Sequence, residues 1–445
     1  MKKAEKMLNM TEGNIISLLI KFSIPMLIGN IFQQVYNLVD SIIVGRCVGA
    51  EAFEAIGTTS SVTFLFFAIC NGIGSGGGII VSQYFGSNDT DKVKKCIANT
   101  AYIMIAFPFV VGVAAFFLSG PVLSLLGTPI SLMPDAVTYI RTMCVGLIFV
   151  SLYNYISSML RALGDSKTPL YFLIFSCILN TGLDLFFVYI FKMGVLGAGI
   201  ATVISQFISG LGCIVYALKK NSYFKLSRDD IKIDTGIMKQ TIKLGVPLSL
   251  QFSLIAISCM ALQKVVNSFG EDAVGAFTAT SRIEQIIHQP YGTLGAALAT
   301  FTGQNYGAKK IDRVYEGYKK GMLLMAIFSL IMLPIMMIFG RGITSIFVEE
   351  TAVIDMGAAA LRITSLFYIF LGAIYVIRGV QNGLGDGVFA LINGVVEIIG
   401  RFTVPILMTS IAFIGVWGIW WSVGVVWFIS ALTTWIRYVC YKKRL

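Results

Sequence analysis

The feature that most constrains this chain is a series of hydrophobic stretches, each long enough to cross a ~30 Å hydrocarbon layer as a helix. The sequence is 56% hydrophobic and only 13% charged, whereas a soluble domain has roughly 25% charged residues. Hydropathy predicts about twelve spans along the 445 residues. We expect them at 15–44, 52–82, 97–119, 134–160, 168–191, 196–218, 238–267, 273–302, 320–340, 356–382, 388–411 and 416–440. The sequence therefore predicts an all-α membrane protein.

The formal net charge of +11 is explained by where the basic residues fall. They gather before the first predicted span, in every second loop and at the end of the chain: Lys2, Lys3, Lys6, Lys92, Lys94, Lys95, Lys167, Lys219, Lys220, Lys309, Lys310, Arg313, Lys442, Lys443 and Arg444. Cytoplasmic loops of membrane proteins carry such an excess of lysine and arginine. We therefore expect a multi-pass protein of the cell membrane with both termini in the cytoplasm, and no nucleic-acid partner.

The residues that enzymes need are poorly represented. The one histidine, His288, makes a histidine metal site or a catalytic triad improbable. The eight cysteines are scattered without a CxxC pair and fit core packing. The run NGIGSGGGII at 71–80 lacks the ending of a phosphate loop. We expect no enzyme and no cofactor, and we interpret the glycine run as a surface for close helix packing or as a source of flexibility.

An internal repeat divides the chain into two halves. IKFSIP at 20–25 returns as IKLGVP at 242–247, SQYFG at 82–86 faces GQNYG at 303–307, and ALGD at 162–165 faces GLGD at 383–386. The last two pairs share an offset of 221 positions. The repeat predicts an N-terminal lobe of six spans at 1–218, a cytoplasmic linker at 219–237 and a C-terminal lobe of six spans at 238–445. Parallel repeats of this kind usually place a substrate path at their interface.

Three motifs give the chain a resemblance to a known family. They are the pattern PxxxxxxxQxxYNxxDxxxVG from Pro25 to Gly45, the segment RALGDSKTP at 161–169, and the glycine-rich turns that open the last span of each half. Along nearly its whole length the chain resembles the multidrug and toxic compound extrusion (MATE) family. The resemblance implies twelve helices in two pseudo-symmetric six-helix lobes forming a V, and cation-driven export of amphipathic, often cationic drugs.

A polar stripe marks the first predicted span. Gln33, Tyr36, Asn37 and Asp40 are spaced i, i+3, i+4 and i+7, so a helix places them on one face, which we expect to look into the bundle. We assign Gln33, Gln34, Tyr36 and Asn37 to the substrate path or its support. A carboxylate at membrane depth costs at least ~2.5 kcal/mol, so Asp40 is a functional-site hypothesis. The alternatives are an aspartate at a water-filled helix end, or one that is hydrogen-bonded for packing.

The fifth span offers a partner for Asp40. Ser176, Asn180 and Asp184 recur every four residues on one face, and Thr202 follows a glycine-rich turn in the sixth span. Within the family, the branch related to the DNA-damage-inducible F proteins carries such residues on its first, fifth and sixth helices. The resemblance thus implies cation binding by Asp40, Asn180, Asp184 and Thr202. Oxygen ligands suit Na⁺, but two neighbouring carboxylates can equally share a proton.

The second half lacks this pattern, because Leu262 and Pro405 stand where the repeat would place the two aspartates. It has other intramembrane charges, among them Glu284 with His288 and Glu397 with Arg401. Each pair is spaced i, i+4, and we favour structural bridges. Another branch of the family uses second-lobe carboxylates for coupling, so Glu284 and Glu397 are second-rank coupling candidates.

Two prolines stand at matching positions, Pro25 in the first span and Pro247 in the seventh. Each should kink its helix, because proline removes an intrahelical hydrogen bond. Pro25 is our candidate hinge for a movement linked to cation binding, and a static bend is the alternative.

Together these features predict a secondary active exporter that exchanges organic cations for Na⁺ or H⁺ by alternating access. We expect small-molecule drugs and the lipid bilayer as partners, and a monomer. The alternative is a lipid-linked precursor flippase of the same wider superfamily, in which a strongly basic cavity is usual.

Overall fold

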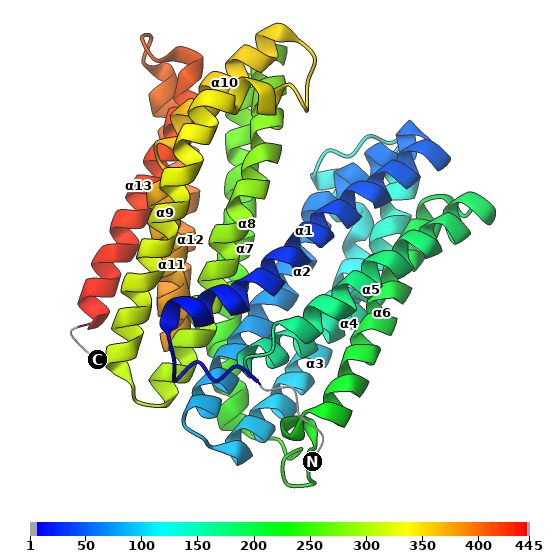
Figure 1. Cartoon of the computed structure of the whole chain (residues 1–445). Coiled ribbons are helices and arrows are strands. Elements are labelled where there is room, and N and C mark those ends of the chain that lie inside the picture. The colour runs from blue at the N-terminus through cyan, green and yellow to red at the C-terminus, as the bar shows by residue number, and fades with distance from the viewer. Residues whose placement is uncertain (1–6, 443–445) are drawn as a thin grey trace. The chain divides into compact units, whose positions relative to one another are not determined.

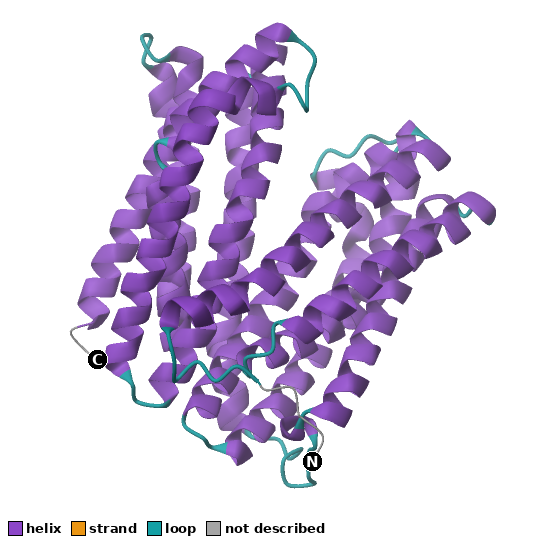
Figure 2. Ribbon diagram, in the orientation of Figure 1, coloured by secondary structure: helices purple, strands orange, loops and turns teal. Residues whose placement is uncertain are grey.

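The structure is a computed structural model that describes residues 7–442. Within this range the chain forms helices joined by loops, with no strand (Figure 2). The predicted all-α class is confirmed.

Each predicted span coincides with a helical segment (Figure 1). The first half contains α1 (Ile15–Cys47), α2 (Ala50–Gly86), α3 (Thr90–Leu125), α4 (Met133–Ala162), α5 (Lys167–Asp184) with a π-helix at Leu185–Ile190, and α6 (Gly194–Lys220). The second half contains α7 (Thr235–Asn267), α8 (Glu271–Gly307), α9 (Ile311–Thr344), α10 (Thr351–Ser365), α11 (Tyr368–Leu384), α12 (Gly387–Ser410) and α13 (Gly418–Lys442). Short 3₁₀ turns occur at Ser222–Phe224 and Gly415–Trp417.

Ten of the described helices are long and apolar enough to cross a membrane. The pair α10 and α11, bent by 53° at their junction, adds an eleventh candidate span. The remaining predicted span is α8, which has the length but is less apolar because it carries charged side chains such as Arg282 and Glu284. The bend between α10 and α11 was not foreseen, since a continuous apolar stretch does not reveal a break in the helix.

The repeated LGD motif ends one helix and begins the next in both halves. Gly164 and Gly385 have φ angles of +89° and +86°, a left-handed conformation that glycine adopts without steric cost. The following aspartates cap the next helix: Asp165 accepts from the Thr168 backbone N–H at 3.0 Å, and Asp386 accepts from that of Phe389 at 3.2 Å. The motif therefore fixes the turns after α4 and α11.

The chain packs as two compact units that do not coincide with the two repeats. Of the described residues, 7–9 and 24–249 belong to the first unit, and 10–23 and 250–442 to the second. The predicted linker at 219–237 therefore lies inside the first unit. The two units exchange the beginnings of their first helices, because the start of α1 packs in the second unit and the start of α7 packs in the first.

Glycines of α2 bring α7 into the first unit. A Cβ atom on Gly76 would lie 2.6 Å from the backbone nitrogen of Gly245, and one on Gly72 would lie 2.4 Å from that of Ser249. The Ser249 hydroxyl donates to the carbonyl of Ile69 at 3.1 Å. Close helix packing, one of the two roles predicted for the glycine run, is confirmed.

The residues just before α1 are held in the second unit by the α8–α9 turn. The Met10 backbone N–H donates to Gln304 Oε1 at 2.9 Å, and its carbonyl accepts from Asn305 Nδ2 at 3.1 Å. Arg313 donates to the Gly13 carbonyl at 3.2 Å. These bonds fix the point from which α1 begins.

Helix packing inside the units follows the repeat. In the first unit α4 contacts α2, α3 and α6, and in the second α11 contacts α8, α9 and α13. Pairs at the edges match as well, since α5 packs on α6 and α12 packs on α13. Two halves with similar sequence patterns thus give two units with similar internal packing.

Candidate functional site

The candidate site lies inside the first unit, where α1, α4, α5 and α6 contribute side chains. Asn180 and Asp184 on α5 are 1% and 0% exposed, and Thr202 on α6 is buried. The α-helix changes to a π-helix immediately after Asp184. Single π turns inside helices frequently occur at functional sites.

Asp40 and Asp184 are the centre of this site. Their carboxyl groups lie within hydrogen-bonding reach of one another. In each, Oδ1 is buried and has no hydrogen-bond partner within the described part of the chain. Two ionised carboxylates cannot hydrogen-bond to each other, so this arrangement needs a proton on one of them or a cation between them.

Asn180 holds Asp184 in place. Its hydrogen-bonding partners assign the amide: the nitrogen donates to Asp184 Oδ2 at 2.7 Å, and the oxygen accepts from the Thr202 backbone N–H at 3.1 Å. The amide thus links the carboxylate on α5 to the backbone of α6. The structure brings together all four residues of the predicted cation set, and their role in binding remains a prediction.

Two tyrosines complete the walls of the site. The Tyr36 hydroxyl lies 3.4 Å from Thr202 Oγ1. Tyr139 on α4 is buried near both aspartates. Sequence reasoning missed Tyr139, because one tyrosine in an apolar span gives no sign of which neighbours it will meet.

The rest of the predicted polar stripe lies elsewhere. Gln33 Nε2 donates to Asn37 Oδ1 at 3.3 Å, an exposed pair, and Gln34 is also exposed. Tyr36 and Asp40, at one edge of the stripe, meet α5 and α6, and the expected inward orientation of the other stripe residues stays a prediction. The assignment of the exposed residues to a substrate path stays a prediction.

Pro25 is buried inside α1, directly after the point at which α1 passes from the second unit to the first. Pro247 lies two residues before the corresponding passage in α7. This position suits a hinge, and that role stays a prediction.

In the second unit, Glu397 is bound by two arginines. Arg378 Nη2 lies 2.7 Å from Glu397 Oε1, and Arg401 Nη2 lies 4.0 Å from Oε2. The predicted pair with Arg401 exists, but Arg378 is the closer partner and was missed. The sequence did offer a signal for this partner, because Arg378 is a charged residue within the predicted span 356–382.

The predicted bridge between Glu284 and His288 is wrong. Both residues are described, and no ion pair joins them; Glu284 Oε1 and His288 Nε2 each lack a hydrogen-bond partner. The His288 ring packs edge-on against Trp427 with centroids 5.6 Å apart. The i, i+4 spacing places both side chains on one face of α8, but that face borders a cavity.

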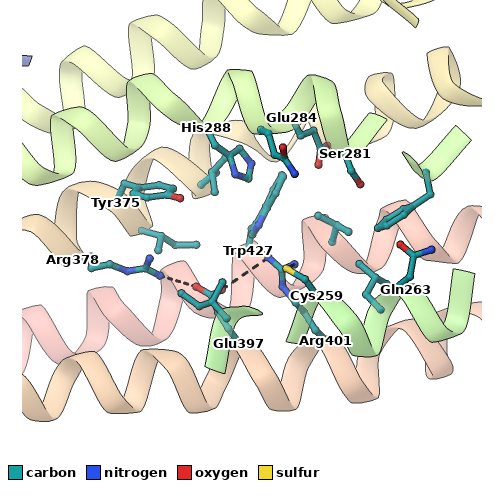
Figure 3. A pocket seen from close by; sticks show the side chains of 17 residues that line it. Cys259, Gln263, Ser281, Glu284, His288, Tyr375, Arg378, Glu397, Arg401 and Trp427 are labelled. Atoms are coloured by element: carbon teal, nitrogen blue, oxygen red, sulfur yellow. Dashed lines mark hydrogen bonds and ion pairs between the residues drawn. The ribbon is translucent and has the colours of Figure 1, made fainter. Parts of the chain in front are cut away.

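The cavity has a volume of about 350 Å³ and is lined by side chains of α7, α8, α11, α12 and α13. Figure 3 shows Glu284 and His288 on one side and Arg378, Glu397 and Arg401 on the other. Its size lies within the range of small-molecule sites. The cavity of the second unit therefore contains both arginines and glutamates, whereas the site of the first unit is built around two carboxyl groups.

Comparisons with known proteins agree with this architecture. The family model MatE matches residues 25–186 and 247–404. The probable multidrug resistance protein YpnP of Bacillus subtilis (strain 168) is 31% identical over 435 residues, covering 97% of each chain. The multidrug export protein MepA of Staphylococcus aureus (strain NCTC 8325) is 21% identical and covers 100% of this chain and 98% of its own.

Solved structures share the fold. A multidrug resistance MATE family transporter in an outward-facing conformation superposes with a TM-score of 0.90 at 22% identity, covering 99% of this chain and 98% of that one. Since the family model covers most of the sequence and YpnP is similar from end to end, the chain belongs to the MatE family of multi-span membrane transporters.

Proposed function

We propose that the protein is a secondary active exporter of amphipathic organic cations, driven by Na⁺ or H⁺ that enters through the site of Asp40 and Asp184. One observation carries the proposal: two neighbouring carboxyl groups, each with an unpartnered buried oxygen, lie inside a bundle of membrane helices. The names of YpnP and MepA support multidrug export. Membership of the DNA-damage-inducible F branch rests on the cation set and stays a prediction.

Each residue of the site has a distinct role in this mechanism. Asp40 and Asp184 bind the coupling ion, which neutralises charge that is costly at membrane depth. Asn180 and Thr202 fix the orientation of Asp184. Ion binding favours one conformation of the transporter, and ion release favours the other. The transporter therefore binds the cationic drug and the coupling ion in turn. The candidate hinge at Pro25 would permit α1 to bend between these states.

The energy available is sufficient. One Na⁺ moving down a tenfold gradient and ~100 mV releases about 3.7 kcal/mol, which sustains a roughly 500-fold gradient of a neutral drug at one-to-one exchange. The oxygen atoms of the carboxylates and the Thr202 hydroxyl suit Na⁺. The direct approach of the two carboxyl groups suits a shared proton equally well.

We further propose that the protein lies in the cell membrane as a monomer with both termini in the cytoplasm. The alternating distribution of basic loops supports this orientation. A lipid-linked precursor flippase is less well supported, because the first unit gathers carboxyl groups where a basic site would be needed for an anionic lipid.

Uptake of ethidium into everted membrane vesicles tests the proposal. A Na⁺ gradient at fixed pH and a pH gradient without Na⁺ are imposed separately. Uptake under the first condition identifies Na⁺ as the coupling ion, and uptake only under the second identifies H⁺. Absence of uptake under both conditions, with the protein present in the membrane, would reject the proposal and favour the flippase.

A further inference from the structure

A groove between α3 and α4 in the first unit takes no part in the proposed function. Its volume is about 240 Å³, and its lining is apolar, with Phe109, Gly112 and Phe116 from α3 and Val145 and Ile148 from α4. Several of the lining side chains are exposed, among them that of Val145. Because both helices are membrane spans, an exposed apolar groove on them opens toward lipid acyl chains.

Gly112 gives the groove its shape. A Cβ atom on Gly112 would lie 2.8 Å from the carbonyl oxygen of Cys144, so α3 and α4 approach closely here because this position has no side chain. The larger side chains of Phe109 and Phe116 line the groove on either side of Gly112 along α3. Phe116 also packs against the hydrophobic core of the unit. The groove is therefore part of the packing of this helix pair.

An arginine lies beside the groove. The Arg141 guanidinium lies over the ring of Phe116, 5.2 Å from its centroid, and Arg141 Nε donates to Ser119 Oγ at 3.2 Å. Within residues 7–442 no carboxylate forms an ion pair with Arg141, whose side chain is exposed. The guanidinium is thus held next to an apolar groove and can bind an external anion.

Arg141 lies near the edge of the hydrocarbon layer. The 30 residues of α4 make a helix about 45 Å long, which exceeds the ~30 Å layer by about 15 Å. Arg141 lies about 12 Å along the helix from Met133, its first residue. With α4 centred in the bilayer, the long side chain of Arg141 reaches the lipid headgroups. Val145 and Ile148 follow farther along the helix and lie in hydrocarbon.

We propose that the groove is a binding site for a glycerophospholipid, whose phosphate binds Arg141 and one of whose acyl chains lies between α3 and α4. A guanidinium binds phosphate through charge-assisted hydrogen bonds, and lipid phosphate is the abundant anion at this depth of a bilayer. Arg141 disfavours a cationic drug as the occupant, because it places a positive charge beside the groove. The site is separate from the two carboxyl groups and does not rest on the proposed function.

Photolabelling of the full-length protein in dodecyl maltoside tests the site. The probe is phosphatidylglycerol with a diazirine in one acyl chain, and mass spectrometry identifies the labelled peptides. We expect the label to concentrate on residues 109–117 and 144–148. Unlabelled phosphatidylglycerol should compete at least about tenfold more effectively than diacylglycerol, which has the same chains but no phosphate, since a hydrogen bond between charged groups contributes that much.

Variants assign the two parts of the site. Arg141→Gln should lower labelling of the groove by about tenfold, and Val145→Trp should lower it by filling the groove. Arg341→Gln is the control for the lost charge, because Arg341 is an exposed arginine of α9. Leu330→Trp is the control for the added indole, because Leu330 is an exposed residue of the same helix. Both controls should leave labelling of the groove unchanged. Gel filtration and thermal unfolding establish that each variant is folded.

Label spread evenly over the lipid-facing helices of the wild-type protein would overturn the proposal. Equal competition by phosphatidylglycerol and diacylglycerol would also overturn it, and neither result needs a variant. A folded Arg141→Gln protein that is labelled like the wild type would reject the phosphate contact and with it the proposal. The vesicle experiment fails independently: an absence of ion-driven ethidium uptake rejects the proposed export function, while phosphate-dependent labelling of the groove still identifies the lipid site.

Discussion

The guanidinium of Arg378 on α11 lies 2.7 Å from the carboxylate of Glu397 on α12, and both side chains are buried. Asn393 joins them, accepting from Arg378 at 2.5 Å and from Gln251 Nε2 at 2.9 Å. Its own amide nitrogen donates to Ser430 Oγ at 2.9 Å. The network links α7, α11, α12 and α13 within the second unit, so its charges stabilise the packing of four helices.

Replacing Arg378 by leucine should destabilise the second unit, because it leaves Glu397 with only the distant Arg401. Removing one partner of a buried ion pair costs about 3–5 kcal/mol. Thermal unfolding of the purified protein in detergent should show a clear loss of stability. Arg341→Leu, an exposed control whose side chain is 62% accessible, should change stability by less than about 1 kcal/mol. Equal stability of the two variants would show that the network does not hold the helices together.

The sequence predicted the helices well and their neighbours poorly. Hydropathy located the helices because the bilayer imposes a minimum length on each apolar segment, and of the predicted spans among the described residues α8 alone falls short of the apolarity of a span. Spacing placed Asn180 and Asp184 on one face of a helix and marked Asp40 in the polar stripe of the first span, and the resemblance joined these three with Thr202 in one cation set. Spacing carries no information on which other helix faces that side, so Tyr139 escaped notice.

The same limit explains the wrong pairing and the missed partner in the second half. The i, i+4 rule suggested partners within one helix: Glu397 does pair with Arg401, at 4.0 Å, whereas Glu284 does not pair with His288. In the structure Glu397 reaches across to Arg378 on another helix, because an ion pair between helices also satisfies packing. The exchange of helix beginnings between units was equally invisible, since the repeat marks evolutionary halves and not packing units.

Asp184→Asn and Asp40→Asn should each reduce ion-driven ethidium uptake at least about tenfold, because the coupling ion loses a charged ligand at membrane depth. The measurement is initial uptake in everted vesicles at equal protein levels. Asp355→Asn removes an exposed carboxylate that pairs with Arg341, and should leave uptake unchanged. Full uptake by both site variants would show that the coupling site lies elsewhere, with Glu284 and Glu397 as the next candidates.

Asn180→Leu tests the positioning of Asp184 separately from its charge. The variant removes the donor that lies 2.7 Å from Asp184 Oδ2 while both carboxylates remain. We expect coupling to persist but the coupling ion to bind more weakly. Half-maximal uptake should then need about tenfold more ion. Uptake measured across a series of Na⁺ concentrations or pH values provides the readout. A complete loss of uptake would instead make Asn180 an essential ligand.

Gly76→Ala should disrupt the packing of α7 on α2. The added Cβ would lie 2.6 Å from the backbone nitrogen of Gly245, and no flexible side chain is there to move. Overpacking of this kind costs about 1–3 kcal/mol, which thermal unfolding in detergent should detect. Gly57→Ala in the same helix is the control, because its Cβ would meet nothing within 4 Å. If both variants unfold alike, the close approach of the two helices is not required for stability.

Pro247→Ala tests whether a proline at the passage between units assists movement. Pro247 lies in α7 two residues before the chain leaves the first unit, as Pro25 lies in α1 at its own passage. Alanine restores an intrahelical hydrogen bond and stiffens the helix. We therefore expect the maximal rate of uptake to fall by about threefold or more. The ethidium concentration at half-maximal rate should change little. Pro405→Ala is the matched control, because Pro405 lies inside α12 and well within the second unit. A static bend predicts that both variants transport at the wild-type rate, whereas a hinge predicts that only Pro247→Ala is slow.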